Sequence, residues 1–218
     1  LDTLRGGGGN DIYVNPGPDL IVEGVGQGTD EIRSAASYSL GASANNVERL
    51  TLTGANNASG TGNALANIIV GNTGNNTLYG AGGVDTLRGG AGDDTYVNPT
   101  GDVVQESAGQ GTDTVRSAVT FSIAAISNLE NLLLLGNANT DGTGNSIANR
   151  ITGTGGRNLL TGNGGNDTLI GGSSNDRMYG GAGDDLFFGK GGIDYLFGNG
   201  GNDRRGDNDP SDVLTDIV

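Results

Sequence analysis

The 218-residue sequence contains no cysteine, no histidine and no tryptophan, and Lys190 is its only lysine. Without cysteine, no disulfide framework can replace a large hydrophobic core. Without histidine, the commonest transition-metal ligand and acid–base catalyst is missing. Eleven basic residues face 25 acidic ones, which leaves no basic patch for nucleic acid or an anionic membrane surface. No apolar run approaches the length of a membrane-spanning helix. We therefore expect neither nucleic-acid binding nor membrane insertion.

Apolar residues are also scarce, because only 33% of the chain is hydrophobic whereas 44 residues are glycine. Glycine loses more backbone freedom on folding than any other residue, so apolar burial alone is a weak source of stability here. The net charge of −14 suggests another source. An acidic, glycine-rich chain of this kind is either disordered or binds cations.

A nine-residue repeat occupies much of the chain. The stretch GGAGDDLFF at 180–188 shows its form, with glycine at positions one, two and four, an acid at six and an apolar residue at eight. Strict runs of the repeat span residues 1–14, 62–97 and 144–206. Position six is occupied by Asp11, Asn67, Asn76, Asp85, Asp94, Asn149, Asn158, Asp167, Asp176, Asp185, Asp194 and Asp203.

A longer repeat of about 83 residues relates the segments between these runs. The motif GQGTD, for example, occurs at 26–30 and again at 109–113. Its acids, Asp30 and Asp113, lie 19 residues after the position-six acids Asp11 and Asp94, whereas two nonapeptides span 18 residues. We interpret them as the same unit with one inserted residue. We interpret 15–61 and 98–143 as looser spacer coils of one continuous solenoid, residues 1–218. Residues 207–218 are expected to start a C-terminal cap, and the chain is expected to be truncated at both ends.

The spacing predicts how one coil is built. Three residues around position eight alternate outward, inward and outward, which makes a very short strand with one buried side chain. The preceding six residues form a turn, in which glycine permits crowded backbone conformations. Two such units close one coil of about 18 residues, and stacked coils pair their strands in parallel about 4.8 Å apart. The predicted fold class is all-β, a parallel β-roll (β-solenoid).

Stacking places each position-six acid above the one two nonapeptides later. Like charges this close repel each other strongly unless a cation lies between them. Glycine turns also expose backbone carbonyls, and carbonyls with carboxylates make an all-oxygen site that suits calcium better than zinc, copper or magnesium. The turn glycines expected to supply carbonyls are Gly89, Gly90, Gly92, Gly162, Gly165, Gly171, Gly172, Gly180, Gly181, Gly183, Gly189 and Gly192.

The candidate calcium ligands are therefore the twelve position-six residues together with Asp30 and Asp113, and we rank their pairs by charge. The Asp–Asp pairs 167/185, 176/194 and 185/203 come first, because each supplies two formal charges. Pairs with one Asn should bind more weakly. The 19-spaced pairs 11/30 and 94/113 are ranked last, because the extra residue is expected to disturb the stacking.

The motif G-G-x-G-x-D-x-U-x, with U a large apolar residue, resembles the calcium-binding nonapeptide of the repeats-in-toxin (RTX) family. GGAGDDTYV at 89–97 and GGAGDDLFF at 180–188 match every defined position. The resemblance implies a parallel β-roll that binds several Ca²⁺ ions in its turns. It also implies a bacterial protein secreted by the type I route to the medium or cell surface, which stays unfolded in the low-calcium cytosol and folds outside.

The sequence favours a structural module over an enzyme. Every acid belongs to a repeat and no GxSxG motif occurs, so no catalytic pair stands apart from its neighbours. We expect a calcium-folded module coupled to secretion, with calcium and neighbouring domains of the same polypeptide as its partners. An alternative is a calcium-rigidified extender of a surface adhesin or surface-layer protein. A minor alternative is an accessory module of a secreted polysaccharide-modifying or lipolytic enzyme.

Overall fold

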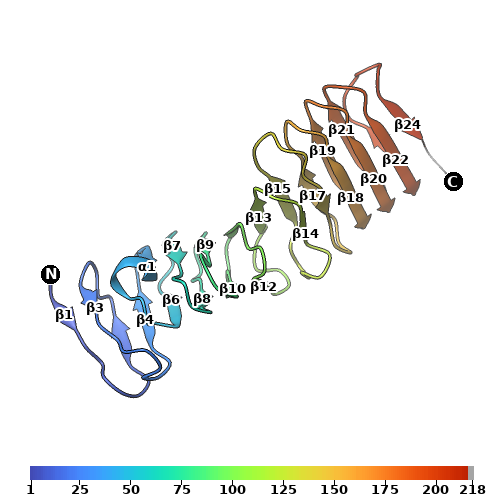
Figure 1. Ribbon diagram of the computed structural model, residues 1–218. Coiled ribbons are helices and arrows are strands. Elements are labelled where there is room, and N and C mark those ends of the chain that lie inside the picture. The colour runs from blue at the N-terminus through green and yellow to red at the C-terminus, as the bar shows by residue number, and fades with distance from the viewer. Residues whose placement is uncertain (216–218) are drawn as a thin grey trace. The chain divides into compact units, whose positions relative to one another are not determined.

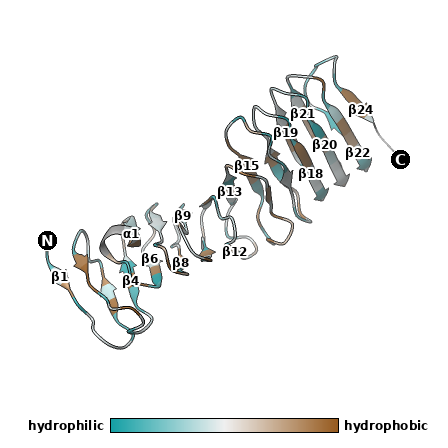
Figure 2. Cartoon of the chain, in the orientation of Figure 1, coloured by the Kyte–Doolittle hydropathy of each residue, from teal (hydrophilic) through white to brown (hydrophobic). Residues whose placement is uncertain are grey.

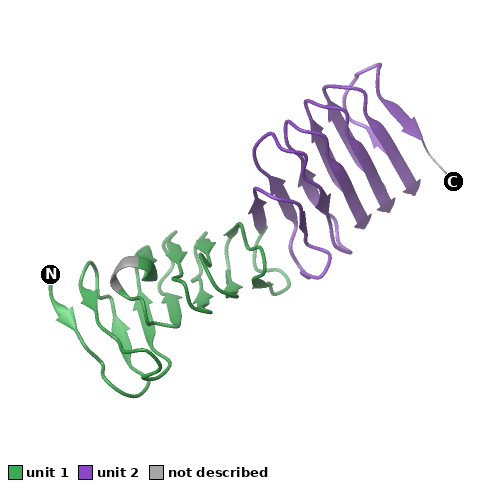
Figure 3. Ribbon diagram, viewed as in Figure 1, with its two compact units in different colours: residues 1–113 green, residues 114–218 purple. Residues whose placement is uncertain are grey.

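The computed structural model describes residues 1–215 as an all-β chain of short parallel strands (Figure 1). The chain forms two compact units, Leu1–Asp113 and Thr114–Val218 (Figure 3). Each unit is a parallel β-solenoid with about 18 residues per coil, as the repeat predicts. Continuity of the solenoid from one unit into the next stays a prediction. The only helix within residues 1–215 is α1 (Leu40–Ser43), and no helix in this range has the length and apolar character needed to cross a membrane.

Unit 1 contains three sets of parallel strands. The first coil pairs β1 (Thr3–Leu4) with β3 (Leu20–Ile21). One larger sheet contains β2 (Ile12–Val14), β4 (Glu31–Ser34), β6 (Arg49–Leu52), β8 (Ile68–Val70), β10 (Thr86–Arg88) and β12 (Val103–Gln105). The other contains β5 (Tyr38–Ser39), β7 (Ser59–Thr61), β9 (Thr77–Tyr79) and β11 (Thr95–Val97). Successive strands therefore alternate between two sheets, as expected when each coil contributes one strand to each side.

Unit 2 repeats this arrangement with longer strands. One sheet contains β13 (Thr114–Ser117), β15 (Asn131–Leu134), β17 (Arg150–Thr152), β19 (Thr168–Gly172), β21 (Leu186–Lys190) and β23 (Arg204–Arg205). The other contains β14 (Phe121–Ser122), β16 (Gly142–Thr143), β18 (Leu159–Gly164), β20 (Arg177–Ala182), β22 (Tyr195–Gly200) and β24 (Val213–Thr215). Strand β24 lies in the segment expected to begin a cap and pairs in parallel with β22, so the solenoid continues there. Residues 216–218 of that segment lie outside the described part of the chain.

The strand register confirms the predicted stacking in the strict repeats. Leu169 pairs with Phe187, two nonapeptides later, and the same step relates Met178 to Leu196. Spacer coils vary in length. For example, Tyr38 pairs with Gly60, so that coil is longer than two nonapeptides. This longer coil contains α1 and the segment after it, and its strands β5 and β7 are still paired in parallel.

Each coil contributes one or two side chains to a thin core. The apolar position-eight residues in the two longer strict runs are completely buried; they are Ile69, Leu78, Leu87, Tyr96, Ile151, Leu160, Leu169, Met178, Phe187 and Leu196. Along the strands, short hydrophobic and hydrophilic segments alternate (Figure 2). On the outside, Tyr179 stacks on Phe197 with ring centroids 4.7 Å apart, as their separation by two nonapeptides predicts.

Candidate metal sites

The position-six aspartates form a ladder that links successive coils. Asp185 Oδ1 accepts a hydrogen bond from the backbone N–H of Asp167 at 2.8 Å. Asp194 Oδ1 accepts from Asp176 N–H at 2.6 Å, and Asp203 Oδ1 accepts from Asp185 N–H at 2.9 Å. The three pairs ranked first from sequence are therefore brought together, each joined through one carboxylate oxygen.

The second oxygen of each of these carboxylates is buried and has no hydrogen-bond partner. Such orphaned atoms are rare in folded proteins, and each one calls for an explanation such as a bound ion. The buried Oδ2 atoms without a partner belong to Asp11, Asp85, Asp94, Asp167, Asp176, Asp185, Asp194, Asp203 and Asp212. All of the predicted aspartate ligands except Asp30 and Asp113 are in this set.

The turn glycines leave room in front of these orphaned oxygens. A Cβ atom added to Gly162 would lie 2.0 Å from Asp167 Oδ2 and 2.5 Å from the carbonyl oxygen of Gly180 in the next coil. A Cβ on Gly171 would likewise lie 2.3 Å from Asp176 Oδ2 and 2.9 Å from the Gly189 carbonyl oxygen. Carboxylate and carbonyl oxygens from two coils thus converge on the same space, which gives the all-oxygen donor set that calcium prefers.

The electrostatics of the ladder also favour a cation. Burial raises the pKa of Asp167 to about 7, and the charge of Asp185 acts in the same direction. Burial, with the charges of Asp212 and Asp176, raises the pKa of Asp194 to about 7. A raised carboxyl pKa means that the buried environment disfavours the negatively charged form of the carboxylate. A bound cation would remove this penalty.

The four asparagines at position six satisfy their own amides. Asn149 Nδ2 donates to the carbonyl oxygen of Leu129 at 2.9 Å, and its Oδ1 accepts from Asn145 N–H at 2.7 Å. Its backbone N–H still donates to Asp167 Oδ1 at 2.7 Å, so the ladder continues. The same pattern, with amide donors turned to carbonyls of the preceding coil, holds at Asn67, Asn76 and Asn158. The carboxamide nitrogen therefore occupies the position next to those carbonyl oxygens in which a cation could bind. A metal-ligand role for these asparagines stays a prediction.

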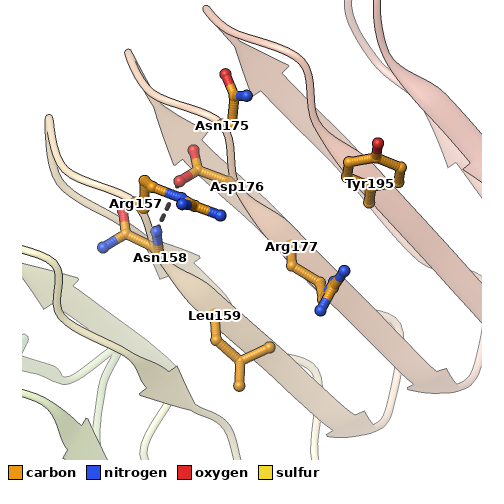
Figure 4. Close-up of a pocket in the computed structure, with 7 residues that line it drawn as sticks. All are labelled: Arg157, Asn158, Leu159, Asn175, Asp176, Arg177 and Tyr195. Atoms are coloured by element: carbon orange, nitrogen blue, oxygen red, sulfur yellow. Dashed lines mark hydrogen bonds between the residues drawn. The ribbon is translucent and has the colours of Figure 1, made fainter.

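Figure 4 shows one mixed pair, Asn158 and Asp176, whose buried side chains line a pocket. The backbone N–H of Asn158 donates to Asp176 Oδ1 at 2.8 Å, and the Arg157 guanidinium lies nearby. The charge of Arg157 lowers the pKa of Asp176, although burial has the larger effect and raises it to about 6. The Arg157 guanidinium therefore compensates part of the negative charge of Asp176 in this pair.

The 19-spaced pairs are joined by the same ladder bond as the 18-spaced ones. Asp30 Oδ1 accepts from Asp11 N–H at 2.9 Å, and Asp113 Oδ1 accepts from Asp94 N–H at 2.8 Å. The expectation that the inserted residue disturbs the stacking of these acids is therefore wrong. The inserted residue is accommodated elsewhere in the turn.

Several acids near the ladder were missed by sequence reasoning. Each 19-spaced pair gains a glutamate, Glu23 or Glu106, whose carboxylate oxygen lies within 4.8 Å of the two aspartates. Asp102 and Asp212 extend the ladder by accepting from the N–H groups of Asp85 and Asp194. Glu23 and Glu106 occupy equivalent places in the long repeat, so that repeat contained a signal for them.

Stacked coils with buried, oxygen-lined glycine turns define a metal-binding parallel β-solenoid. The chain matches the RTX calcium-binding nonapeptide repeat family in four copies, at residues 2–14, 61–96, 143–178 and 179–204, which together cover just over half of it. The chain belongs to this family, and membership implies calcium binding. No curated protein matches the chain.

Proposed function

We propose that this chain is a structural module of an exported bacterial protein that folds when it binds extracellular calcium. The observation that carries the proposal is the row of buried carboxylate oxygens without partners, exemplified by Asp167, Asp185 and Asp194. In the absence of metal, each of these oxygens is desolvated and uncompensated, which opposes folding. A cation shared between two coils turns the same feature into a stabilising one.

Calcium concentration then sets the folding equilibrium. Weak extracellular calcium modules have dissociation constants of roughly 0.1–1 mM. At a hundredfold excess of calcium over the dissociation constant, each site adds about 2.7 kcal/mol to the folded state. Five such sites together are comparable with a typical domain stability of about 5–15 kcal/mol. A chain of this kind stays unfolded in a low-calcium cytosol, which suits export through a narrow type I channel, and folds outside.

A second candidate function, an extender of a surface protein, is favoured by the repetition of whole sites at the period of the long repeat. Asp11, Glu23 and Asp30 recur as Asp94, Glu106 and Asp113 with the same contacts. Repetition of a whole unit of about 83 residues lengthens a solenoid without changing its coils, which suits a protein that acts as a spacer. Catalysis by this chain is not part of either proposal.

The proposal is tested by the hydrodynamic radius of the purified chain in excess EGTA, in calcium and in magnesium. We expect the radius of an unfolded 218-residue chain in EGTA and in magnesium, and a compact species in millimolar calcium. A compact species in EGTA would contradict calcium-driven folding. The extender function requires more: tandem copies of the chain should grow in length in proportion to copy number by small-angle scattering, and copies that collapse onto one another would exclude it.

A further inference from the structure

Two clusters of three carboxylates stand apart from the two-carboxylate turns. In unit 1, oxygens of Asp94, Glu106 and Asp113 lie within 4.8 Å of one another, and those of Asp11, Glu23 and Asp30 do the same. Each cluster arises where a strict nonapeptide is followed by a spacer coil. The strict repeat supplies the first aspartate, the spacer supplies the second through its GQGTD motif, and the glutamate comes from the segment between them.

A tyrosine fixes the glutamate in each cluster. The Tyr96 hydroxyl donates to Glu106 and accepts from the backbone N–H of Gly89 at 2.7 Å. The Tyr13 hydroxyl donates to Glu23, whose same oxygen also accepts from Gly6 N–H at 3.1 Å. These hydrogen bonds to Oε1 fix the orientation of each glutamate carboxylate. The arrangement is preorganised, because the tyrosine ring is itself a buried core residue at position eight.

Buried oxygens without partners point into both clusters. Asp94 is 1% exposed and Glu23 is 8% exposed, yet Asp94 Oδ2 and Glu23 Oε2 have no hydrogen-bond partner. A Cβ added to Gly89 would lie 2.1 Å from Asp94 Oδ2 and 2.7 Å from the Tyr96 hydroxyl oxygen. The glycine at position one therefore keeps open a space that is lined by the aspartate and the tyrosine, next to the glutamate.

We propose that Asp94, Glu106 and Asp113, and likewise Asp11, Glu23 and Asp30, each hold one hard cation more tightly than the two-carboxylate turns do. The third carboxylate adds a formal charge and a ligand, and ligand charge is what tunes calcium affinity in oxygen sites. The same charge favours trivalent lanthanide ions, which are hard cations that also bind to carboxylate oxygens. This inference rests on the proposed function, since both place cations on stacked carboxylates, and it adds a class of site that the nonapeptide alone does not contain.

The tyrosines allow a direct test, because an excited tyrosine transfers energy to a Tb³⁺ ion bound close to it. The calcium-folded chain, residues 1–218, is titrated with Tb³⁺ while sensitised emission and circular dichroism are recorded. The first two equivalents of Tb³⁺ should produce most of the emission. In the double variant Tyr13→Phe/Tyr96→Phe these equivalents should still bind but give little emission. Undiminished emission in this variant would overturn the proposal.

The glutamate contribution is tested by the double variant Glu23→Gln/Glu106→Gln, in which the hydrogen bond from tyrosine can still be made. Loss of a group one shell outside a metal costs about 10–100-fold in affinity, and loss of a ligand should cost at least about tenfold. Glu31→Gln is the matched control, because the Glu31 carboxylate accepts from Arg33 and Thr51 and Glu31 belongs to neither cluster. If the double variant binds the first equivalents as tightly as the control, the proposal fails, while calcium-dependent folding of the same variant would leave the proposed function standing.

Discussion

The carboxylate of Asp185 joins two coils through one oxygen and leaves the other bare. Its Oδ1 accepts the backbone N–H of Asp167 at 2.8 Å, and its Oδ2 is buried without a partner. Asp185 N–H in turn donates to Asp203 Oδ1. Each interior aspartate thus belongs to two rungs of the ladder, so a change at one aspartate acts on two rungs at once.

Replacing Asp185 with alanine should affect both rungs. We expect Asp185→Ala to bind fewer calcium ions than the unchanged chain, measured by equilibrium dialysis, and to need more calcium to fold. The matched control is Asp184→Ala, because Asp184 is exposed and its Oδ1 accepts from Asn202 N–H. Unchanged calcium stoichiometry in Asp185→Ala would show that the pairing scheme is wrong.

Adding a carboxylate should create a site. In Asn149→Asp, the amide donor to the Leu129 carbonyl is lost, and a second carboxylate oxygen takes the place of the amide nitrogen in front of that carbonyl. The backbone N–H of residue 149 can still donate to Asp167 Oδ1. The variant should bind more calcium by dialysis and should be less stable than the unchanged chain in chelator, because a buried charge replaces a satisfied amide. A variant that loses stability in chelator without gaining calcium would indicate that the asparagine turns lack the other ligands.

A methyl group at a position-one glycine should block a site without straining the backbone. In Gly180→Ala the new Cβ would lie 2.0 Å from Asp185 Oδ2, and Gly180 does not have a positive φ. We expect the midpoint of calcium-induced folding to rise. Gly191→Ala is the control, because its Cβ would make only ordinary contacts, the nearest at 3.6 Å. Equal midpoints for the two variants would contradict a ligand role for the oxygen next to Gly180.

The metal-free chain should lose stability as the pH rises. Burial and neighbouring charges raise the pKa of Asp167 and Asp194 to about 7, above the ordinary value of 3.8 that applies to the unfolded chain. Between about pH 4 and pH 7 the folded state therefore binds more protons than the unfolded state, and the free energy of unfolding falls with increasing pH. After calcium has been removed by dialysis, the chain should show a stronger β signal by circular dichroism near about pH 4 than near about pH 7. A signal that grows with pH in the absence of calcium would contradict this.

The fold was predictable because the repeat length determines the number of residues in one coil, which is twice the length of the nonapeptide. Position eight gave the core, and the step of two nonapeptides gave the register of Leu169 on Phe187. The acid pairs followed from the same arithmetic. What spacing alone did not reveal was hydrogen-bond chemistry, since asparagine and aspartate share a position but only asparagine satisfies its own side chain.

The spacer coils were harder to predict because their length varies. An inserted residue was expected to separate Asp94 from Asp113, yet the turn absorbs it and the ladder bond is kept. Glu106 does not occupy a nonapeptide position, so a search for the short repeat passes over it. Its recurrence as Glu23 was visible at the longer period, and its contact with Tyr96 required the folded structure.

Calcium-driven folding is the central claim, and one titration at neutral pH tests it most directly. Calcium is added to metal-free chain while bound calcium and the β signal by circular dichroism are measured on the same samples. The β signal should be nearly absent in excess EGTA and should appear cooperatively with bound calcium, and magnesium should not replace calcium. The same β signal with and without excess EGTA would contradict the account.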